Sequence, residues 1–244
     1  MKRTITFLLF FWAVTSLMAQ SSCGTVKDYD GNTYSTVQIG EQCWMKQNLR
    51  TKHYADGESI PSGDSSTSYS SPFYYDYSNS GIPLEERGYL YNWSAAMHGA
   101  SFSDTNPSHV QGICPDGWHL PSDAEWTQLT DYVRSRSEYV CGGDTENIAK
   151  ALASTEYWER WDVDECVVGD PRRHPNNATG FSAVPAGDCV GSSFHNAGNY
   201  AYFWSSTEHG GDHAYSRLLY YDGAGVGRYG NFRSDGFSVR CLRD

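Results

Sequence analysis

The sequence is poor in positive charge, and beyond its first 20 residues it has no long hydrophobic run. Its 18 Lys and Arg face 29 Asp and Glu, which gives a formal net charge of −11. Binding to nucleic acid or anionic lipid needs clustered Lys and Arg against the phosphates, so we expect neither partner. Gly, Asp, Ser or Asn interrupts every later hydrophobic run, and none is long enough to cross a bilayer. We therefore expect no transmembrane segment in the mature chain.

Motifs that would identify an enzyme or a calcium-dependent lectin are also missing. The Gly-x-Ser-x-Gly turn of many hydrolases is absent, as are the Glu-Pro-Asn and Trp-Asn-Asp triplets that hold calcium against sugar. The missing triplets do not exclude a calcium site of another kind. Ser-His-Asp triads and carboxylate pairs depend on which residues are close in space, and the spacing along the sequence does not show that. His209 and His213 flank Gly210-Gly211, which favours a solvated loop over a metal site. We expect no catalytic residue, no metal and no cofactor.

The start of the chain has the pattern of a signal peptide. Lys2 and Arg3 precede an apolar run over residues 5 to 14, and Ala19 is a small residue at a suitable cleavage point. The run is too short for a stable membrane anchor. We predict that residues 1–19 are a signal peptide and that residues 20–244 form one exported domain.

Seven cysteines follow this leader, and cysteines usually pair in an oxidising compartment. Because seven is odd, at least one lies outside intramolecular pairing. Lipidation of Cys23 would leave six and tether the protein to a membrane, although the preceding Gln20-Ser21-Ser22 lacks the apolar residue of a lipoprotein motif. Cys189 is the favoured unpaired thiol.

The other six cysteines suggest one pairing among several. Cys23 and Cys43 flank a predicted hairpin, Cys141 and Cys166 bracket a polar segment, and Cys114 with Cys241 would join the centre of the chain to its last strand. Six cysteines can pair in many ways, so connectivity stays open at this stage.

Short elements separated by turns predict an α+β fold. Residues 25 to 40 are predicted to form a hairpin around Asp30-Gly31-Asn32, and residues 55 to 83 a long surface loop. Residues 88 to 97 should begin extended and become a short helix. The last two strands are expected over residues 214 to 221 and 237 to 241.

The best helix signal lies at residues 120 to 133. Ser122 can act as N-cap with Glu125 three positions later, the arrangement of a capping box. Trp126 and Leu129 recur at helical spacing behind it. A second, shorter helix is predicted over residues 147 to 153.

Several motifs occur in an order that closely resembles the Fibrobacter succinogenes major paralogous domain, a family of exported bacterial proteins. The resemblance covers residues 23 to 244. The motifs are Asp28-Tyr29-Asp30-Gly31-Asn32-Thr33-Tyr34, Ile39-Gly40-Glu41-Gln42-Cys43-Trp44-Met45, Asn48-Leu49, Cys114-Pro115-Asp116-Gly117-Trp118-His119-Leu120-Pro121-Ser122, Gly180-Phe181-Ser182-Ala183, Phe203-Trp204-Ser205-Ser206-Thr207-Glu208 and Gly236-Phe237-Ser238-Val239-Arg240-Cys241.

That family is distantly similar to the formylglycine-generating enzyme superfamily and to C-type lectin folds. The resemblance implies a C-type lectin-like fold with its termini close together, and it implies no agreed activity. Formylglycine-generating enzymes bind copper through two nearby cysteines, whereas this chain has only Cys241 near its C-terminus. We therefore do not carry that activity over. Trp118, Trp126 and Trp204 are expected in the core, with Glu125 capping a helix.

Residues 209 to 235 contain no Glu, Gln, Lys, Met or Trp. This composition resembles the variable region of proteins diversified by retroelements, which mutate adenines in Asn-type codons and display the variants on a C-type lectin-like scaffold. Family members are also rich in Tyr and Asn here, which is the simpler explanation. In either case Tyr, Ser, Gly, Asn and Arg suit a recognition surface.

The functional prediction is an exported, non-catalytic recognition or adhesion module that binds a protein or carbohydrate ligand. The alternatives are an enzyme-like relative of the formylglycine-generating superfamily with altered chemistry, and a structural surface or pilus component. The predicted ligand-binding residues are His213, Tyr215, Tyr220, Tyr221, Asp222, Arg228, Tyr229, Asn231, Phe232 and Arg233.

Overall fold

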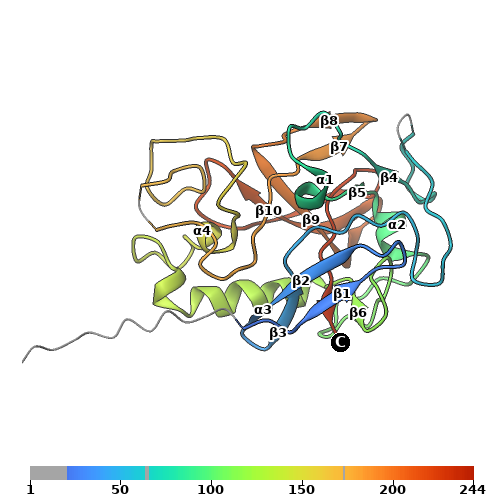
Figure 1. Ribbon diagram of the computed structural model, residues 1–244, viewed down its shortest axis with the longest axis horizontal. Helices are drawn as coiled ribbons and strands as arrows, with labels where there is room; N and C mark the ends of the chain where they lie inside the picture. Colours follow the sequence, from blue (N-terminus) through green and yellow to red (C-terminus); the bar gives the residue numbers. More distant parts are fainter. Residues whose placement is uncertain (1–20, 64–65, 173) are drawn as a thin grey trace, which may run out of the picture.

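A computed structural model describes residues 21–63, 66–172 and 174–244, so the predicted signal peptide lies outside the described residues. Short antiparallel strands predominate over a few helices, which confirms the α+β class (Figure 1). Within the described part of the chain, no helix is long and apolar enough to cross a membrane.

The first sheet brings the two ends of the described chain together. Its β1 and β2 form the predicted hairpin, with Val26 opposite Tyr34, and Leu242 near the C-terminus pairs with Trp44. The five strands, in sheet order, are β1 (Thr25–Lys27), β2 (Thr33–Ile39), β3 (Gln42–Met45), β12 (Leu242–Arg243) and β6 (Trp118–His119).

The second sheet comes from the C-terminal third of the chain. It has the order β11-β10-β9, with β9 at Tyr200–Gly210, β10 at His213–Tyr220 and β11 at Gly227–Phe232. The predicted strand at 214 to 221 is therefore confirmed, whereas the one at 237 to 241 is wrong. That segment is buried between the sheets and makes isolated bridges, such as Phe203 to Ser238. β11 escaped prediction because its glycines interrupt the β-branched and aromatic pattern of a strand.

Smaller elements complete the fold. Residues 88 to 97 begin as a strand and continue as a helix, as predicted, while the second predicted helix is only one turn long. The described residues of the predicted loop at 55 to 83 are irregular apart from one short strand and isolated bridges, and a short helix begins directly after them at Leu84. These elements are β4 (Tyr74–Tyr75), α1 (Leu84–Arg87), β5 (Leu90–Tyr91), α2 (Trp93–Met97), η1 (Ser137–Tyr139), α4 (Ala149–Leu152), β7 (Asp188–Val190) and β8 (Ser193–His195).

The longest helix, α3 (Asp123–Arg134), begins at the predicted capping box. Ser122 Oγ accepts the N–H of Glu125 at 3.2 Å, and the Glu125 carboxylate accepts the N–H of Ser122 at 2.8 Å. Both bonds satisfy donors that the first helical turn leaves free. The helix starts later than residue 120 because Leu120 and Pro121 lead into this cap.

The core is aromatic, as the shared tryptophans suggested. Trp118, Trp126 and Trp204 are all buried, which confirms their predicted place. Ring centroids of Trp44 and Trp126 lie 4.7 Å apart, and Phe181 packs edge-on against both. Large rings supply the buried apolar area that the few aliphatic residues do not.

Buried Arg240 joins three of the motifs that mark the family resemblance. Its Nε donates to Asn48 Oδ1 at 2.9 Å, its Nη2 to the carbonyl of Ser182 at 2.6 Å and its Nη1 to the carbonyl of Phe181. A buried guanidinium needs such acceptors to offset its lost hydration. These motifs therefore hold the fold together.

The three preferred disulfides are confirmed, and Cys189 is the free, buried thiol. Because the Cys23 sulfur is bonded to Cys43, it is not available to carry a lipid in this structure. The pairs are Cys23–Cys43, Cys114–Cys241 and Cys141–Cys166.

Candidate functional site

The predicted ligand-binding residues lie on and around the second sheet, but they do not share one face. Successive side chains of a strand point to opposite sides. In β10, Tyr215 and Arg217 therefore point to one side and Ser216 to the other. Their partners in β11 follow the same rule, since Arg217 pairs with Arg228 and Ser216 with Tyr229.

One face of the sheet is fastened to α3 through Asp123. Arg217, only 3% exposed, donates to the Asp123 carboxylate and, at 3.0 Å, to its carbonyl. Arg228 Nε donates to both carboxylate oxygens of Asp123 at 3.0 and 2.9 Å. Burial lowers the pKa of Arg217, and the Asp123 carboxylate opposes this effect. The first residue of α3 thus fixes the position of two strands.

Beyond this contact, the same face carries a cluster that we call the hairpin patch: His209, His213, Tyr215, Arg228 and Phe232. The Arg228 guanidinium lies 3.7 Å from the Tyr215 ring, which His209 contacts at 4.5 Å. His213 packs on Phe232 at 4.3 Å, and Phe232 is 48% exposed. The patch is an ordered group of accessible aromatic and basic side chains on paired strands.

Three predicted residues lie on the opposite face. The rings of Tyr220 and Tyr229 are 6.4 Å apart, and Tyr200 of β9 packs against Tyr220 at 5.2 Å. Asn231 Oδ1 accepts a hydrogen bond from Ser216 at 2.7 Å. Tyr229 is the most accessible of them, at 47% exposure.

The remaining three predicted residues lie at the edges of the sheet. Tyr221 and Asp222 follow β10, where the Tyr221 ring contacts Trp161 at 5.5 Å. Arg233 pairs with Glu208 and covers the ring of Trp93 at 4.5 Å, so its charge is already engaged. Four of the ten predicted residues, His213, Tyr215, Arg228 and Phe232, therefore form one group together with His209.

Two buried carboxyl groups escaped the sequence analysis. Asp188 and Asp235 flank the backbone pairing of Cys189 with Gly236. Burial, and then the nearby charge of Asp188, raises the pKa of Asp235 to about 7. Burial also raises the pKa of Asp188, whose carboxylate accepts from Asn196 at 2.6 Å. No sequence signal pointed to them, because only tertiary pairing brings the two acids together.

Two groups of side chains are of the types that bind metal ions. His209 and His213 lie on either side of the β9–β10 turn, with ring centroids 6.4 Å apart. Among the described residues, one group of three has ligand atoms within 4.8 Å of one another: Asp56, Glu58 and His98. Both of its carboxylates are exposed, and the group alone identifies no ion.

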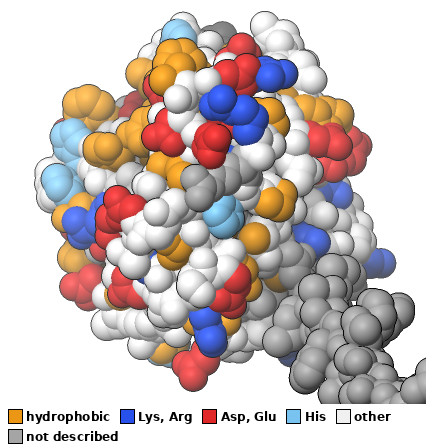
Figure 2. Space-filling view, turned by 90° about the vertical axis from the view of Figure 1, so that its left-hand side faces the viewer, with side chains coloured by type: hydrophobic (Ala, Val, Ile, Leu, Met, Phe, Trp, Pro, Cys, Tyr) orange, Lys and Arg blue, Asp and Glu red, His pale blue; other side chains and the backbone are white. Residues whose placement is uncertain are grey.

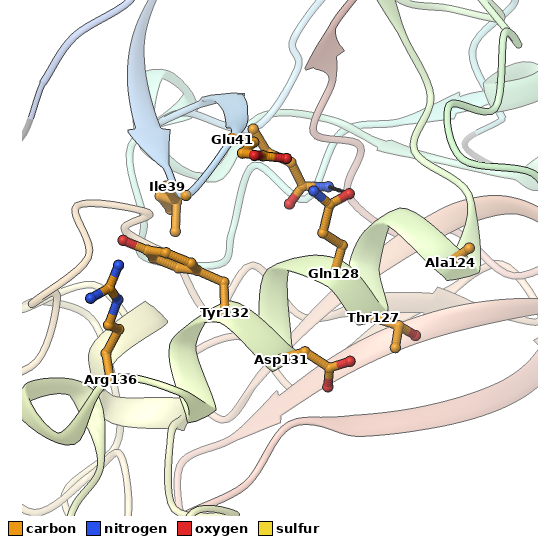
Figure 3. A pocket seen from close by; sticks show the side chains of 10 residues that line it. Ile39, Glu41, Ala124, Thr127, Gln128, Asp131, Tyr132 and Arg136 are labelled. Atoms are coloured by element: carbon orange, nitrogen blue, oxygen red, sulfur yellow. Dashed lines mark hydrogen bonds between the residues drawn. The ribbon is translucent and has the colours of Figure 1, made fainter.

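The largest hollow described, of about 770 Å³, lies between the β2–β3 turn and α3. In Figure 3, Gln128 and Tyr132 project from α3 toward Ile39 and Glu41, while Asp131 points away. Its described lining contains no Ser, Cys or His and none of the ten predicted residues. The full lining is Ile39, Gly40, Glu41, Gln42, Ala124, Thr127, Gln128, Asp131, Tyr132 and Arg136.

Comparison with known proteins identifies the family. The model of the Fibrobacter succinogenes major domain matches residues 37–243, which is most of the chain. The chain therefore belongs to this family, as its motifs indicated. No curated protein and no solved structure matches it.

Proposed function

We propose that this member of the Fibrobacter succinogenes major domain family is an exported, non-catalytic recognition or adhesion module for a protein or carbohydrate ligand. The observation that carries the proposal is the hairpin patch. It presents an exposed Phe232, a histidine pair and an Arg228 stacked on Tyr215 from hydrogen-bonded strands. Rigid aromatic rings with an Arg are the side chains that supply most binding energy at protein surfaces.

Preorganisation supports this assignment. The Arg228 guanidinium is hydrogen-bonded to the Asp123 carboxylate and stacks on the Tyr215 ring, so little side-chain entropy remains to be lost on binding. Its exposed outer face still offers N–H donors to a ligand, since 49% of the side chain is accessible. Carboxylates or hydroxyls of a partner match these donors.

The C-type lectin-like fold belongs to the same proposal. Two main antiparallel sheets, one principal helix and long loops support it, as does the five-stranded sheet, which contains both β1 and β12 and so joins the two ends of the described chain. In such an arrangement the five-stranded sheet holds the two chain ends together, and the β11-β10-β9 sheet is available for recognition.

Three disulfides support a place outside the cytoplasm. Disulfides persist in secreted and surface proteins because no reducing system acts there. We therefore place the domain in the secreted fraction or on the bacterial cell surface.

If retroelements diversify residues 209 to 235, the structure restricts which positions can change. Leu218 and Leu219 are buried, and Arg217 is bonded to Asp123. Substitutions there would cost stability. Variation compatible with folding would be concentrated at exposed positions such as Phe232 and Tyr229. Sequencing the locus for a reverse transcriptase and an adenine-substituted repeat tests whether this region is diversified.

The binding proposal is tested with Phe232→Ala on a printed glycan array and on an array of surface proteins. Phe102→Ala is the matched control, because Phe102 is 56% exposed and lies outside the patch. Loss of a bound spot with Phe232→Ala but not with Phe102→Ala supports the hairpin patch. If Tyr220→Ala with Tyr229→Ala removes binding instead, the opposite face is the site. Unchanged binding in both cases refutes recognition through this sheet.

A further inference from the structure

A second hollow, of about 340 Å³, lies among the loops that follow α4, at the left of Figure 1. We call it the loop pocket. Its volume suits one small ligand. Figure 2 looks at this side of the molecule and shows acidic, basic and hydrophobic side chains interspersed. Its described lining residues are Thr155, Tyr157, Trp158, Arg160, Val168, Gly169, Asp170, Pro171, Pro175 and Asn176.

Two adjacent aromatic residues of the loop pocket are held in costly states. Tyr157 has a φ of 72°, a left-handed conformation that bulky residues rarely adopt. Trp158 Nε1 is buried and has no hydrogen-bond acceptor among the described residues. An unsatisfied buried donor costs stability, and strained backbone tends to occur at ligand sites. Both features are costs that a ligand-contacting segment tolerates, and both fall on residues that line the loop pocket.

The Asn176 amide in the loop pocket is fixed by hydrogen bonds through its nitrogen, while its oxygen is left to accept one. Asn176 Nδ2 donates to the carbonyls of Ser154 at 3.0 Å and Val168 at 3.1 Å. These bonds fix the amide plane, and the amide oxygen accepts no hydrogen bond within the described chain. Thr155 adds an exposed hydroxyl. The pocket thus offers an oriented acceptor and a hydroxyl beside its aromatic rings.

The charged side chains that line the loop pocket already have partners. Arg160 is the one cation among its described lining residues, and its Nε already donates to both carboxylate oxygens of Asp162 at 2.8 Å. The carboxylate of Asp170 is paired with Arg172. A phosphate or carboxylate would compete with these acids. A neutral ligand that hydrogen-bonds through hydroxyls would not.

We propose that the loop pocket binds one residue of a neutral carbohydrate, with a sugar face against Tyr157 and Trp158 and a hydroxyl donating to the Asn176 amide oxygen. The inference deepens the proposed recognition function by naming its ligand class and a second surface. Gly169 of the pocket donates to the carbonyl of Tyr221 at 2.7 Å, next to Trp161, which is 39% exposed. A longer oligosaccharide can therefore extend from the pocket over Trp161.

The test uses the disulfide-bonded domain with free glucose, galactose and N-acetylglucosamine as probes. Saturation-transfer NMR and tryptophan fluorescence are expected to show saturable binding of at least one sugar. Trp158→Ala removes the indole ring against which the sugar face packs and should weaken binding about tenfold. Binding of none of the three sugars to the unmodified domain would overturn the inference.

Tyr157→Gly separates binding from folding. Glycine adopts a positive φ without strain, so this variant should unfold at the same temperature or higher while losing sugar binding. Tyr157→Phe keeps the ring and should keep binding. Phe232→Ala should also keep it. If Phe232→Ala abolishes sugar binding and Tyr157→Gly does not, the sugar site lies in the hairpin patch: the loop pocket is refuted while the proposed function stands.

Discussion

The imidazole of His119 is buried against the carboxylate of Glu125, with Nε2 and Oε1 2.8 Å apart. Its other nitrogen, Nδ1, lies 2.7 Å from Asp244 Oδ1. The same Glu125 carboxylate closes the capping box of α3 through the Ser122 N–H. A titratable side chain from β6 therefore links the last residue of the chain to the start of the main helix.

This arrangement makes stability depend on pH. Burial lowers the pKa of His119, but the hydrogen bonds and charges of Glu125 and Asp244 outweigh it and raise the pKa above 6.5. The stabilisation is complete below the unfolded pKa and is lost as pH rises through the folded one. In urea titrations, the free energy of unfolding of the unmodified domain should fall more than that of His119→Gln as pH rises from about 6.5, the unfolded pKa, through the higher folded pKa. Equal slopes for the two proteins would refute the coupling, and His209→Gln, at an exposed histidine, is the control.

Asp235, a second buried titratable group, should also destabilise the folded state as pH rises. Burial and Asp188 raise its pKa from 3.8 to about 7, so the folded state favours the neutral acid. The penalty is absent below the unfolded pKa, grows up to about pH 7 and is constant above it. Asp235→Asn should therefore raise the free energy of unfolding by up to about 4 kcal/mol at pH 8 and change it little at pH 4. Asp222→Asn replaces an exposed acid and should change the free energy of unfolding little at either pH. A gain from Asp235→Asn that is the same at pH 4 and pH 8 would contradict the prediction.

The disulfides should differ in their contribution to stability. Cys114–Cys241 spans 127 residues and Cys141–Cys166 spans 25. Loop entropy in the unfolded chain predicts a loss of about 4 to 5 kcal/mol for the double Cys→Ala variant of the first pair and about 3 for the second. Denaturant unfolding of both variants measures which of them loses more stability. The reverse order would show that native packing, not loop length, dominates.

Asp123 should contribute far more to stability than Asp131, another acidic residue of α3. Asp123→Ala leaves the buried Arg217 without its carboxylate and should cost about 3 to 5 kcal/mol. Asp131→Ala on the same helix breaks an exposed pair with Arg134 and should cost less than about 1 kcal/mol. Thermal unfolding of the two variants provides the comparison. Similar losses would mean that the Asp123 pair contributes no more than a surface ion pair.

Local features were predictable because their causes lie within a few residues. The capping box at Ser122 and Glu125 and the turn at 30 to 32 depend on neighbouring backbone groups. Tryptophan burial was predictable because water disfavours large apolar rings wherever they occur. The family resemblance was readable for the same reason, since its motifs are cores, caps and turns.

By itself, the amino-acid sequence determined the α+β class, the main helix, the N-terminal hairpin and the family, and it suggested the cysteine pairs that the structure contains. Only tertiary structure decided which of the ten predicted residues come together, because β11 escaped prediction and it is the pairing of β10 with β11 that sets Phe232 opposite His213. It also decided which acids are buried together and where Trp158 lacks an acceptor. Burial and charge at those positions come from strands and loops distant in sequence, so no local pattern encodes them.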